Sequence, residues 1–321
     1  MNKIEKELSI IIPHYNSWQY LQELLESIPR KEWVEIIVVD DNSTNFHENI
    51  ITFENSFPNV TFLRNNLRNK GAGAARNIGL QNATGNWLLF ADADDKFEVN
   101  FLDEIGKYFE TDYDIVYFSP ISFISDGQEL STRHLRYKRY ITKYTDEQSE
   151  TNELKLRYLF EPPWSKLIRS KIIRANDIKF EEIMYSNDIL FSAKVGYYAK
   201  KIRASNSIIY KIRQNEGSLT TFISEKTFLI RFNAWLDYAS FLKTKLPKVK
   251  FRKLSLSSFQ FIVKLFKYNL RISLLIYVIR KSWKQHISIF DKRILNVKEL
   301  YDSIRRDREI SSKISETNIK E

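Results

Sequence analysis

The sequence has no cysteine, and glycine and proline are scarce, with 8 and 7 residues among 321. The absence of cysteine excludes a disulfide-stapled fold and any zinc or iron–sulfur site built on thiolates. Glycine and proline are too few for a collagen-like chain, and 43% hydrophobic with 28% charged residues excludes a wholly disordered one. A chain of this length can bury a substantial core in one large α/β domain, or in a domain with an appendage.

Long apolar runs are also missing. No window of about 18 residues is apolar throughout, so we expect no membrane-spanning helix. The charged residues 1–6 lead directly into a strand-like run, which leaves no space for a signal peptide. The chain is therefore expected to act in the cytoplasm.

Positive charge is concentrated in the C-terminal third. Up to Lys226 there are 29 Lys and Arg against 32 Asp and Glu, a balance of −3; from Arg231 onward there are 21 against 8, a balance of +13. Such a region suits nucleic acid, an anionic membrane surface or another polyanionic partner. A solvated helical surface would explain the same charges.

Strands and helices alternate in the first part of the chain. Apolar runs rich in β-branched residues predict buried strands at residues 8–12, 36–39, 60–63 and 87–90. Helical spacing predicts helices at 18–28 and after Gly71. This order favours a doubly wound α/β sheet, whose ligand crevice lies at the carboxyl ends of its strands. Polar clusters that would meet at this edge are residues 15–16, 40–41 and 92–95.

The acids after the fourth predicted strand suggest a divalent cation. No P-loop motif is present, and Gly71-x-Gly73 lacks the third glycine of the dinucleotide fingerprint, which disfavours a P-loop ATPase and an ordinary NAD enzyme. Asp92 and Asp94 can instead hold Mg²⁺ or Mn²⁺, which would bridge the oxygens of a diphosphate. An acidic pair at a strand end also commonly serves as a cap or a solvated turn.

Five sequence blocks follow one another in a fixed order. They are residues 8–16 (LSIIIPHYN), 37–43 (IVVDDNS), 69–77 (NKGAGAARN), 83–85 (ATG) and 90–95 (FADADD). Together they resemble the family 2 glycosyltransferases, which are inverting, nucleotide-sugar-dependent enzymes with the GT-A fold. The match is close over the first 100 residues and weaker from there to residue 222.

This resemblance implies a set of site residues. Asp92 and Asp94 would form the metal-binding motif, with Asp94 as the direct ligand, and the forked donors of Arg76 and the point charge of Lys70 suit a diphosphate. A surface residue on a small-residue helix is the plain alternative for Arg76. The residues expected to bind the nucleotide sugar are Pro13, Tyr15, Asn16, Asp40, Asp41, Lys70, Arg76, Asp92, Ala93, Arg213 and Ser218.

Neighbouring acids after the second strand cannot share one role. A carboxylate can accept from N3–H of uracil, where cytosine offers an acceptor instead. Asp40 and Asp41 point to opposite sides of an extended chain. We therefore expect Asp41 to contact the base and Asp40 to cap the following turn.

An inverting transfer also needs a base on the far side of the sugar from the diphosphate. The family places it in a Glu-Asp pair at the start of a downstream helix, and the matching segment here is residues 185–191 (YSNDILF). Asp188 falls at the base position, while Asn187 replaces the usual Glu. An acid favoured by the helix dipole is the structural alternative, and Glu181 and Glu182 are the nearest competitors.

Two further segments fit the same resemblance. Trp164 lies in residues 162–168 (PPWSKLI), near the expected acceptor site, where it could stack on a sugar ring or equally pack in the core. Residues 213–220 (RQNEGSLT) resemble a late loop of the family, in which Arg213 and Ser218 would donate to phosphate. An ordinary glycine-containing turn explains that loop nearly as well.

The C-terminal part is expected to be helical. Along residues 257–283 one stripe carries Gln260, Lys264, Lys267 and Arg271, and another carries Phe259, Ile262, Val263, Phe266 and Leu270. This pattern is typical of a helix in the interface of an anionic membrane. A bundle packed on the catalytic domain or on a second subunit is equally consistent. We expect a catalytic domain at 1–225 and a helical region at 226–321.

We therefore expect an enzyme that uses a UDP-sugar and Mn²⁺ or Mg²⁺. The resemblance to family 2 implies that it builds a bacterial capsule, lipopolysaccharide or other surface polysaccharide. Its acceptor would be a glycan or lipid-linked glycan at the inner face of the cytoplasmic membrane. A sugar nucleotidyltransferase is one alternative, although its glycine-rich loop after the first strand is missing. A nucleic-acid-binding protein that uses the basic tail is the other, and the acids near the expected phosphate site disfavour it.

Overall fold

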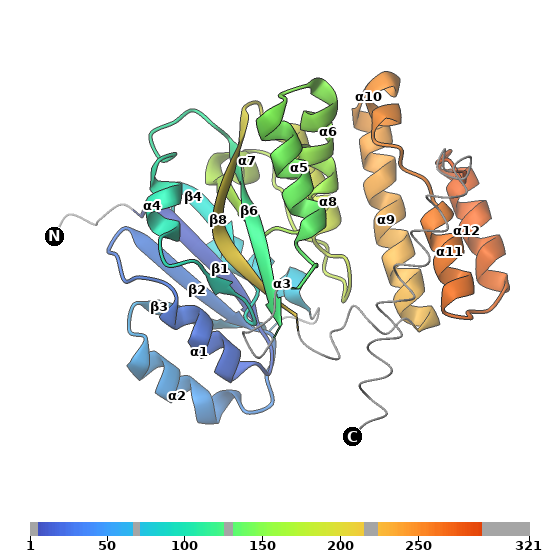
Figure 1. The fold of residues 1–321 in the computed structure, drawn as a ribbon. Helices are drawn as coiled ribbons and strands as arrows, with labels where there is room; N and C mark the ends of the chain where they lie inside the picture. The colour runs from blue at the N-terminus through green and yellow to red at the C-terminus, as the bar shows by residue number, and fades with distance from the viewer. Residues whose placement is uncertain (1–5, 67–70, 125–130, 215–223, 291–321) are drawn as a thin grey trace. The chain divides into compact units, whose positions relative to one another are not determined.

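The computed structural model describes residues 6–66, 71–124, 131–214 and 224–290. Backbone contacts divide the chain into two compact units, residues 1–242 and 243–321. The first unit carries a β-sheet, and the described part of the second is helical (Figure 1). The compact unit extends past residue 225, and the expectation that the catalytic domain itself ends there stays a prediction.

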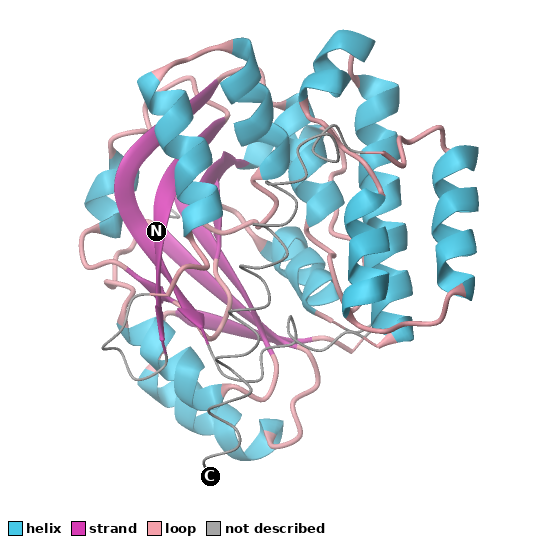
Figure 2. Cartoon of the chain, turned by 45° about the vertical axis from the view of Figure 1, so that its right-hand side comes forward, coloured by secondary structure: helices cyan, strands magenta, loops and turns pink. Residues whose placement is uncertain are grey.

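One mixed sheet organises the first unit. Among the described residues it has eight strands in the order β3-β2-β1-β4-β7-β6-β8-β5, with helices on both sides (Figure 2). The strands are β1 (Leu8–His14), β2 (Val34–Asp40), β3 (Val60–Arg64), β4 (Trp87–Phe90), β5 (Lys96–Phe97), β6 (Ile115–Ile124), β7 (Lys166–Arg169) and β8 (Ile202–Gln214).

The helices of this unit fill the connections between the strands. They are α1 (Trp18–Glu26), α2 (Phe46–Ser56), α3 (Ala72–Asn82), α4 (Phe101–Gly106), α5 (Leu135–Asp146), α6 (Glu150–Leu159), α7 (Ser170–Ala175) and α8 (Ile189–Tyr198). A ninth, α9 (Glu225–Lys245), runs across the boundary between the units. Its N-terminal part belongs to the first unit, where the hydroxyl of Tyr238 donates to the carbonyl of Tyr158 at 2.8 Å.

The half of the sheet formed by β1 to β4 is parallel, as predicted. Every residue of β1 is buried, because helices cover the sheet on both faces. Pro13 lies near the end of β1, beyond the last residue that pairs with β4, so its missing N–H costs no ladder hydrogen bond. The parallel α/β organisation inferred from the sequence is confirmed.

The other half of the sheet is mixed. Strand β7 runs antiparallel to both β4 and β6, whereas β6 and β8 are parallel to each other. The β6–β8 ladder shifts register around Ser119 and Pro120, where proline cannot donate a ladder bond. Strand β8 matters for the site, since its last residues pass beneath the loop that follows β4.

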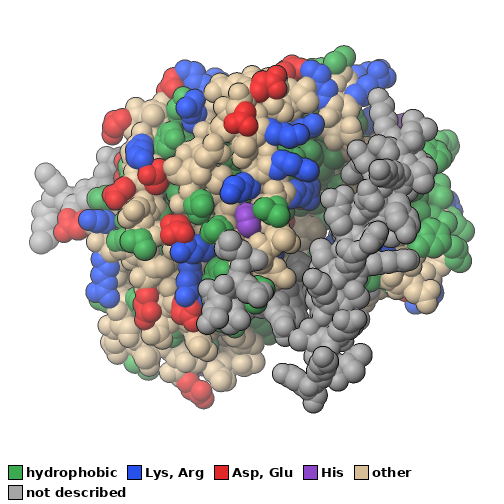
Figure 3. Space-filling view, viewed as in Figure 1, with side chains coloured by type: hydrophobic (Ala, Val, Ile, Leu, Met, Phe, Trp, Pro, Cys, Tyr) green, Lys and Arg blue, Asp and Glu red, His purple; other side chains and the backbone are tan. Residues whose placement is uncertain are grey.

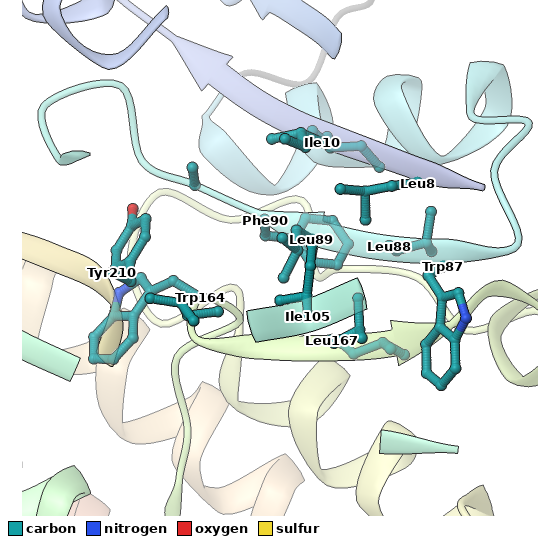
Figure 4. Packing of buried hydrophobic residues seen from close by; sticks show 14 of the residues in the cluster. Leu8, Ile10, Trp87, Leu88, Leu89, Phe90, Ile105, Trp164, Leu167 and Tyr210 are labelled. Atoms are coloured by element: carbon teal, nitrogen blue, oxygen red, sulfur yellow. The ribbon is translucent and has the colours of Figure 1, made fainter. Parts of the chain in front are cut away.

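Apolar side chains from both halves of the sheet form one continuous core. Figure 4 shows Leu8 and Ile10 of β1 above β4, with Leu167 of β7 on the other side of that strand. Trp87 is fully buried at the start of β4, and the guanidinium of Arg169 lies 4.0 Å from the centre of its ring. This core fixes the ends of the strands on which the site is built.

The described part of the second unit contains α10 (Lys248–Lys253), α11 (Phe259–Lys267) and α12 (Ser273–Lys284). Helices α11 and α12 pack on each other. Phe261 and Leu265 of α11, and Leu274 and Val278 of α12, are buried. Within the described ranges, none of the helices combines the length and the apolarity needed to cross a bilayer.

A close backbone approach provides a test of this architecture. Gly85 precedes β4, its N–H donates to Oγ of Ser9 at 2.8 Å, and its carbonyl accepts from Oγ of Ser170. A Cβ at Gly85 would lie 2.6 Å from the backbone nitrogen of Ser9, so Gly85→Ala must displace main chain. We expect it to lower the free energy of unfolding by about 1–3 kcal/mol in denaturant titrations.

Gly106→Ala is the matched control. A Cβ at Gly106, the last residue of α4, would have no neighbour within 4 Å. We expect that variant to be as stable as the parent or slightly more stable, because alanine restricts the unfolded chain. Equal stability of the two variants would contradict the tight approach at Gly85.

Candidate active site

Loops at the carboxyl ends of β1, β2 and β4 lie side by side, because these three strands are adjacent and parallel. The N-terminal ends of α3 and α8 reach the same edge, where their side chains and backbone bond to these loops. The polar clusters expected at one edge are therefore brought together, and a helix from much later in the chain joins them.

His14 ties the end of β1 to the end of β2. Its Nε2 accepts a hydrogen bond from the N–H of Ser17 at 3.2 Å, so its Nδ1 carries the proton and donates to Asp40 at 3.0 Å. The second oxygen of Asp40 accepts from the N–H of Ser43 at 3.0 Å. Burial raises the pKa of Asp40, but the bonds from His14 and Ser43 outweigh it and leave that pKa lowered. Asp40 thus caps the turn, as predicted.

Asp41 ties the same turn to α3. Its Oδ1 accepts from Nδ2 of Asn65 at 2.7 Å, and its Oδ2 accepts from the N–H of Gly71 at 2.6 Å. Gly71 has a φ of +108°, which an L side chain rarely adopts. Each carboxylate oxygen has a second lone pair, so contact between Asp41 and a nucleobase stays a prediction.

Other residues predicted for the nucleotide pocket surround this turn. The ring of Tyr15 is 58% exposed, which suits stacking on a base. Asn16 joins the β1 and β2 loops, since its Oδ1 accepts from the N–H of Thr44 at 2.9 Å. Pro13 is buried near the end of β1, and Ala93 is buried in the turn that follows β4.

The loop after β4 is supported by Tyr210 of β8. The tyrosine hydroxyl accepts from the N–H of Asp92 at 2.8 Å and bonds to the carboxylate of Asp95. Asp95 also accepts from the N–H of Arg213 at 2.7 Å. Burial and the charges of Asp94 and Asp92 raise the pKa of Asp95 well above its usual range. Asp95 is therefore an internal support of the loop.

Asp92 and Asp94 remain as the carboxylates that can serve a ligand. The Asp92 side chain is partly exposed. Burial, and next the charge of Asp92, raise the pKa of Asp94, while Arg133 and Arg213 lower it. A divalent cation would relieve that repulsion.

The donor set at this loop fits a magnesium or manganese ion held partly by its substrate. Among the described residues no group of three or more His, Cys, Asp or Glu is arranged to hold a metal. Hard ions that act on nucleotides are often bound by one or two carboxylates plus phosphate oxygens and water. Asp92 and Asp94 supply that number of protein ligands.

Arg76 joins the three parts of the site. From α3, its guanidinium donates to Oδ1 of Asn187 at 2.9 Å and to Oδ1 of Asp92 at 2.5 Å. The side chain is 5% exposed and lies over the ring of Phe180, 5.3 Å from its centre. Among the residues that the structure describes, its buried Nε has no hydrogen-bond partner. Arg76 is thus a buried bridge, and the surface alternative is wrong.

Asp188 is the N-cap residue of α8, beside Asn187. Its carboxylate makes no capping bond to the first turn of that helix. An acid at this position is still favoured by the helix dipole, so the role of Asp188 as the base stays a prediction. Burial raises the pKa of Asp188 to about 6, against the charge of Arg76, which lowers it. A carboxyl group with this pKa is ionised at neutral pH and still basic enough to take a proton.

The two competitors for the base have other contacts. Glu182 accepts from Nδ2 of Asn77 at 3.2 Å. The N–H of Glu181 donates to the carbonyl of Asn187 at 3.2 Å, and a Cβ on Gly73 would clash with the Glu181 carbonyl. The segment before α8 is thereby held against α3.

The guanidinium of Arg213 lies inside the protein. Its Nε donates to the carbonyl of Asp94 at 2.8 Å and another guanidinium nitrogen donates to Glu23 at 2.6 Å. The side chain is 4% exposed and lies close to the rings of Tyr20 and Phe123. Through these bonds it supports the β4 loop, and its contact with phosphate stays a prediction. Ser218 and Lys70, also predicted for the diphosphate, lie outside the described residues.

Trp164 lies in the core, which favours the packing alternative over a sugar-stacking surface. Its ring stacks on Tyr210 with centres 5.9 Å apart and meets Tyr137 edge-on at 5.2 Å. Figure 4 shows Trp164 and Tyr210 as neighbours. Only 5% of its surface is exposed. Because Tyr210 in turn supports Asp92, Trp164 contributes to the site from beneath.

Lys166 was missed by the sequence analysis. This lysine of β7 is 2% exposed, and its Nζ donates to the carbonyl of Phe160 at 2.6 Å and to Oγ of Ser192 at 3.0 Å. Ser192 lies one turn after Asp188 and donates its N–H to the Asp188 carbonyl. Burial lowers the pKa of Lys166 to about 7, although Asp188 and Glu161 oppose this. A lysine within an apolar strand run was the available signal.

Known proteins resemble this chain in sequence and in structure. GlyA, a glycosyltransferase of Streptococcus pneumoniae, is 29% identical over 70% of this chain and 33% of its own length. TarS of Staphylococcus aureus, a poly(ribitol-phosphate) beta-N-acetylglucosaminyltransferase, is 25% identical over 69% of this chain and 38% of its own length. The chain thus spans about a third of the length of these relatives.

Solved structures show the fold. TarS 1–349 in complex with UDP-GlcNAc superimposes with a TM-score of 0.64, covering 87% of this chain and 80% of that one at 21% identity. The mannosyltransferase PcManGT of Pyrobaculum calidifontis, in complex with GDP-Man and Mn²⁺, gives 0.54 over 77% and 67% at 15% identity. The sheet and its helices therefore have the GT-A fold, as expected.

The family assignment rests on the residues that form this edge. Residues 9–175 match the family described as glycosyl transferase family 2, and they include the β1, β2 and β4 loops together with Arg76. The chain belongs to glycosyl transferase family 2.

Proposed function

We propose that the chain is an inverting glycosyltransferase that moves a sugar from a UDP-sugar to a hydroxyl of a glycan or lipid-linked glycan. The observation that carries this proposal is the bridge from Asp92 through Arg76 and Asn187 to the helix end at Asp188. It sets a donor-binding loop and a basic carboxylate on two sides of one edge. The products would be bacterial surface polysaccharides such as capsule, lipopolysaccharide or teichoic acid. A relative from Bacillus subtilis, 26% identical over 73% of this chain, is named minor teichoic acid biosynthesis protein GgaA, which supports this class of product.

The donor is proposed to be a UDP-sugar with its base near Tyr15 and Asp41. The exposed ring of Tyr15 can stack on uracil, and a second lone pair of Asp41 can accept from uracil N3–H. A structural relative bound to UDP-GlcNAc supports this choice. A GDP-sugar, as in the complex of PcManGT, is the donor that the test below must exclude.

Asp92 and Asp94 would hold Mn²⁺ or Mg²⁺. When bound, such an ion neutralises charge on the diphosphate leaving group. Arg76 fixes the orientation of Asp92 through their hydrogen bond, and Arg213 holds the backbone of Asp94 from below. Arg76 therefore sets the direction of the Asp92 carboxylate, and Arg213 holds the backbone that carries Asp94, before any nucleotide arrives.

Asp188 is proposed as the general base. It accepts the proton of the acceptor hydroxyl while the hydroxyl oxygen bonds to the anomeric carbon from the face opposite the diphosphate. The bond from that carbon to the diphosphate breaks, and UDP leaves with the electron pair. A single displacement of this kind inverts the anomeric centre, so an α-linked donor gives a β-linked product.

Two other functions are less well supported. A sugar nucleotidyltransferase would need a glycine-rich loop after β1, where this chain has His14 and Tyr15. A nucleic-acid-binding protein would hold phosphates with lysine and arginine side chains, whereas the described edge of the sheet gathers carboxylates.

We place the activity in the cytoplasm, at the inner face of the membrane, where a lipid-linked acceptor would be presented.

UDP-sugars should stabilise the protein in a metal-dependent manner. With Mn²⁺ present, thermal shift and UDP release measured over a panel of UDP- and GDP-sugars should single out UDP donors. In Asp94→Ala the affinity for UDP in the presence of Mn²⁺ should fall by about tenfold or more, since a metal ligand is lost. Asp103→Ala, at an exposed acid in the first turn of α4, is the control. Stabilisation by GDP-sugars alone would refute the assignment of Asp41.

Removing the base should stop sugar transfer but leave binding of the donor nucleotide intact. We expect Asp188→Asn to lower kcat by about 10²–10⁴-fold, which is the usual contribution of a positioned base, with UDP affinity nearly unchanged in calorimetry. Asp177→Asn is the matched control, because Asp177 is an exposed acid paired with Lys179. Full activity in Asp188→Asn would move the base elsewhere, with Glu182 as the next candidate.

The rate should depend on pH through Asp188. Its pKa is about 6 and the base acts only when ionised, so kcat/KM should be constant above pH 7 and fall by about tenfold per unit below pH 6. UDP affinity measured over the same range would separate loss of the base from loss of metal at Asp94. A flat profile down to pH 5 in folded protein would show that Asp188 is not the base.

A further inference from the structure

Helix α12 exposes a row of apolar side chains that its own fold does not use. Ile272, Ile276, Ile279 and Trp283 are 67%, 59%, 38% and 76% exposed. Their spacing of four, three and four residues places them within about 60° of arc on a helix of 3.6 residues per turn. We name these four residues the outer stripe. Figure 3 shows hydrophobic side chains gathered in this part of the surface.

The opposite face of α12 already supplies the packing of the unit. Leu274, Val278 and Ser282 are buried there, and α12 contacts α11. In α11 the buried residues are Phe261 and Leu265. The two helices thus have their mutual interface without the outer stripe, so the exposed residues are not needed to close the described core.

The charge around the stripe is of one sign. Residues 243–290 contain twelve Lys and Arg and no Asp or Glu. Arg280 and Lys284 lie along one flank of the outer stripe and are exposed. A second copy of the chain would place its own positive charges next to these, and the like charges would repel each other. Nucleic acid is bound through its phosphates, so binding to it would not explain an exposed row of isoleucines. An apolar row with a cationic flank is complementary to anionic lipid.

We propose that α12 lies flat on an anionic phospholipid surface, with the outer stripe inserted among the acyl chains and Arg280 and Lys284 at the headgroups. A helix of 12 residues is about 18 Å long, too short to cross the bilayer. Trp283 near one end of the stripe suits the interface, where its ring can be partly wet. This surface differs from the α11 stripe expected from the sequence, and it does not depend on the catalytic proposal.

Vesicle sedimentation with the full chain tests the proposal. We expect it to pellet with vesicles that contain phosphatidylglycerol and to stay in solution with pure phosphatidylcholine, with binding weakened by salt. The double variant Ile276→Ser with Trp283→Ser should bind about tenfold more weakly, because two inserted side chains are lost. Ile51→Ser, on α2 and 64% exposed in the parent, should bind as the parent does.

Three further measurements separate lipid binding by the outer stripe from misfolding and from dimer formation. The double variant should keep the parent's circular dichroism, its thermal shift with UDP and its elution volume in gel filtration. Failure of the parent to pellet with anionic vesicles would overturn the proposal, as would equal binding by parent and double variant. A dimer of the parent that the double variant loses would assign the stripe to a second copy of the chain instead.

Discussion

The guanidinium of Arg76 lies between the loop that follows β4 and the start of α8. Asn187, just before α8, is more than a hundred residues after Arg76 in the sequence. Its bonds to Asp92 and Asn187 fix the distance between the donor loop and the segment that carries Asp188. Small residues of α3 allow this approach, since a Cβ on Gly73 would clash with the carbonyl of Glu181. Because a buried cation must be paired, the loop and the helix end cannot move apart independently. The geometry of the proposed reaction therefore depends on one side chain.

The acids of the site are kept close by supports from below. Asp95 accepts from the backbone of Arg213, and Tyr210 bonds both to Asp95 and to the N–H of Asp92. Trp164 stacks on Tyr210 and Lys166 bonds to the first turn of α8 through Ser192. Like charges in a poorly solvated loop repel each other, so the loop stays folded only because these neighbours hold its backbone. The residues under the site are accordingly as important to its shape as those that line it.

Much of the parallel half of the sheet could be predicted from the sequence. The strands β1 to β4 are short apolar runs that end in polar residues, and such local patterns are enough to predict a buried strand. The mixed half could not be derived in this way, because the pairing of β6 with β8 joins segments about ninety residues apart and leaves no local signal. The same reason explains Arg213, Trp164 and Lys166, whose roles depend on which distant segments surround them. The capping bond of Asp40 could be predicted because it is local, whereas the contact of Asp40 with the nucleotide sugar stays a prediction.

Asn187 affects how readily its neighbour Asp188 ionises. At this position the family usually has a glutamate, and here a neutral amide accepts the bond from Arg76. A second carboxylate would share the guanidinium charge and add a negative neighbour to Asp188, which would make that group harder to ionise. With asparagine, more of the arginine charge acts on Asp188. With Asp188 as the proposed base, this chain should thus stay active in more acidic surroundings than a relative that carries the Glu-Asp pair.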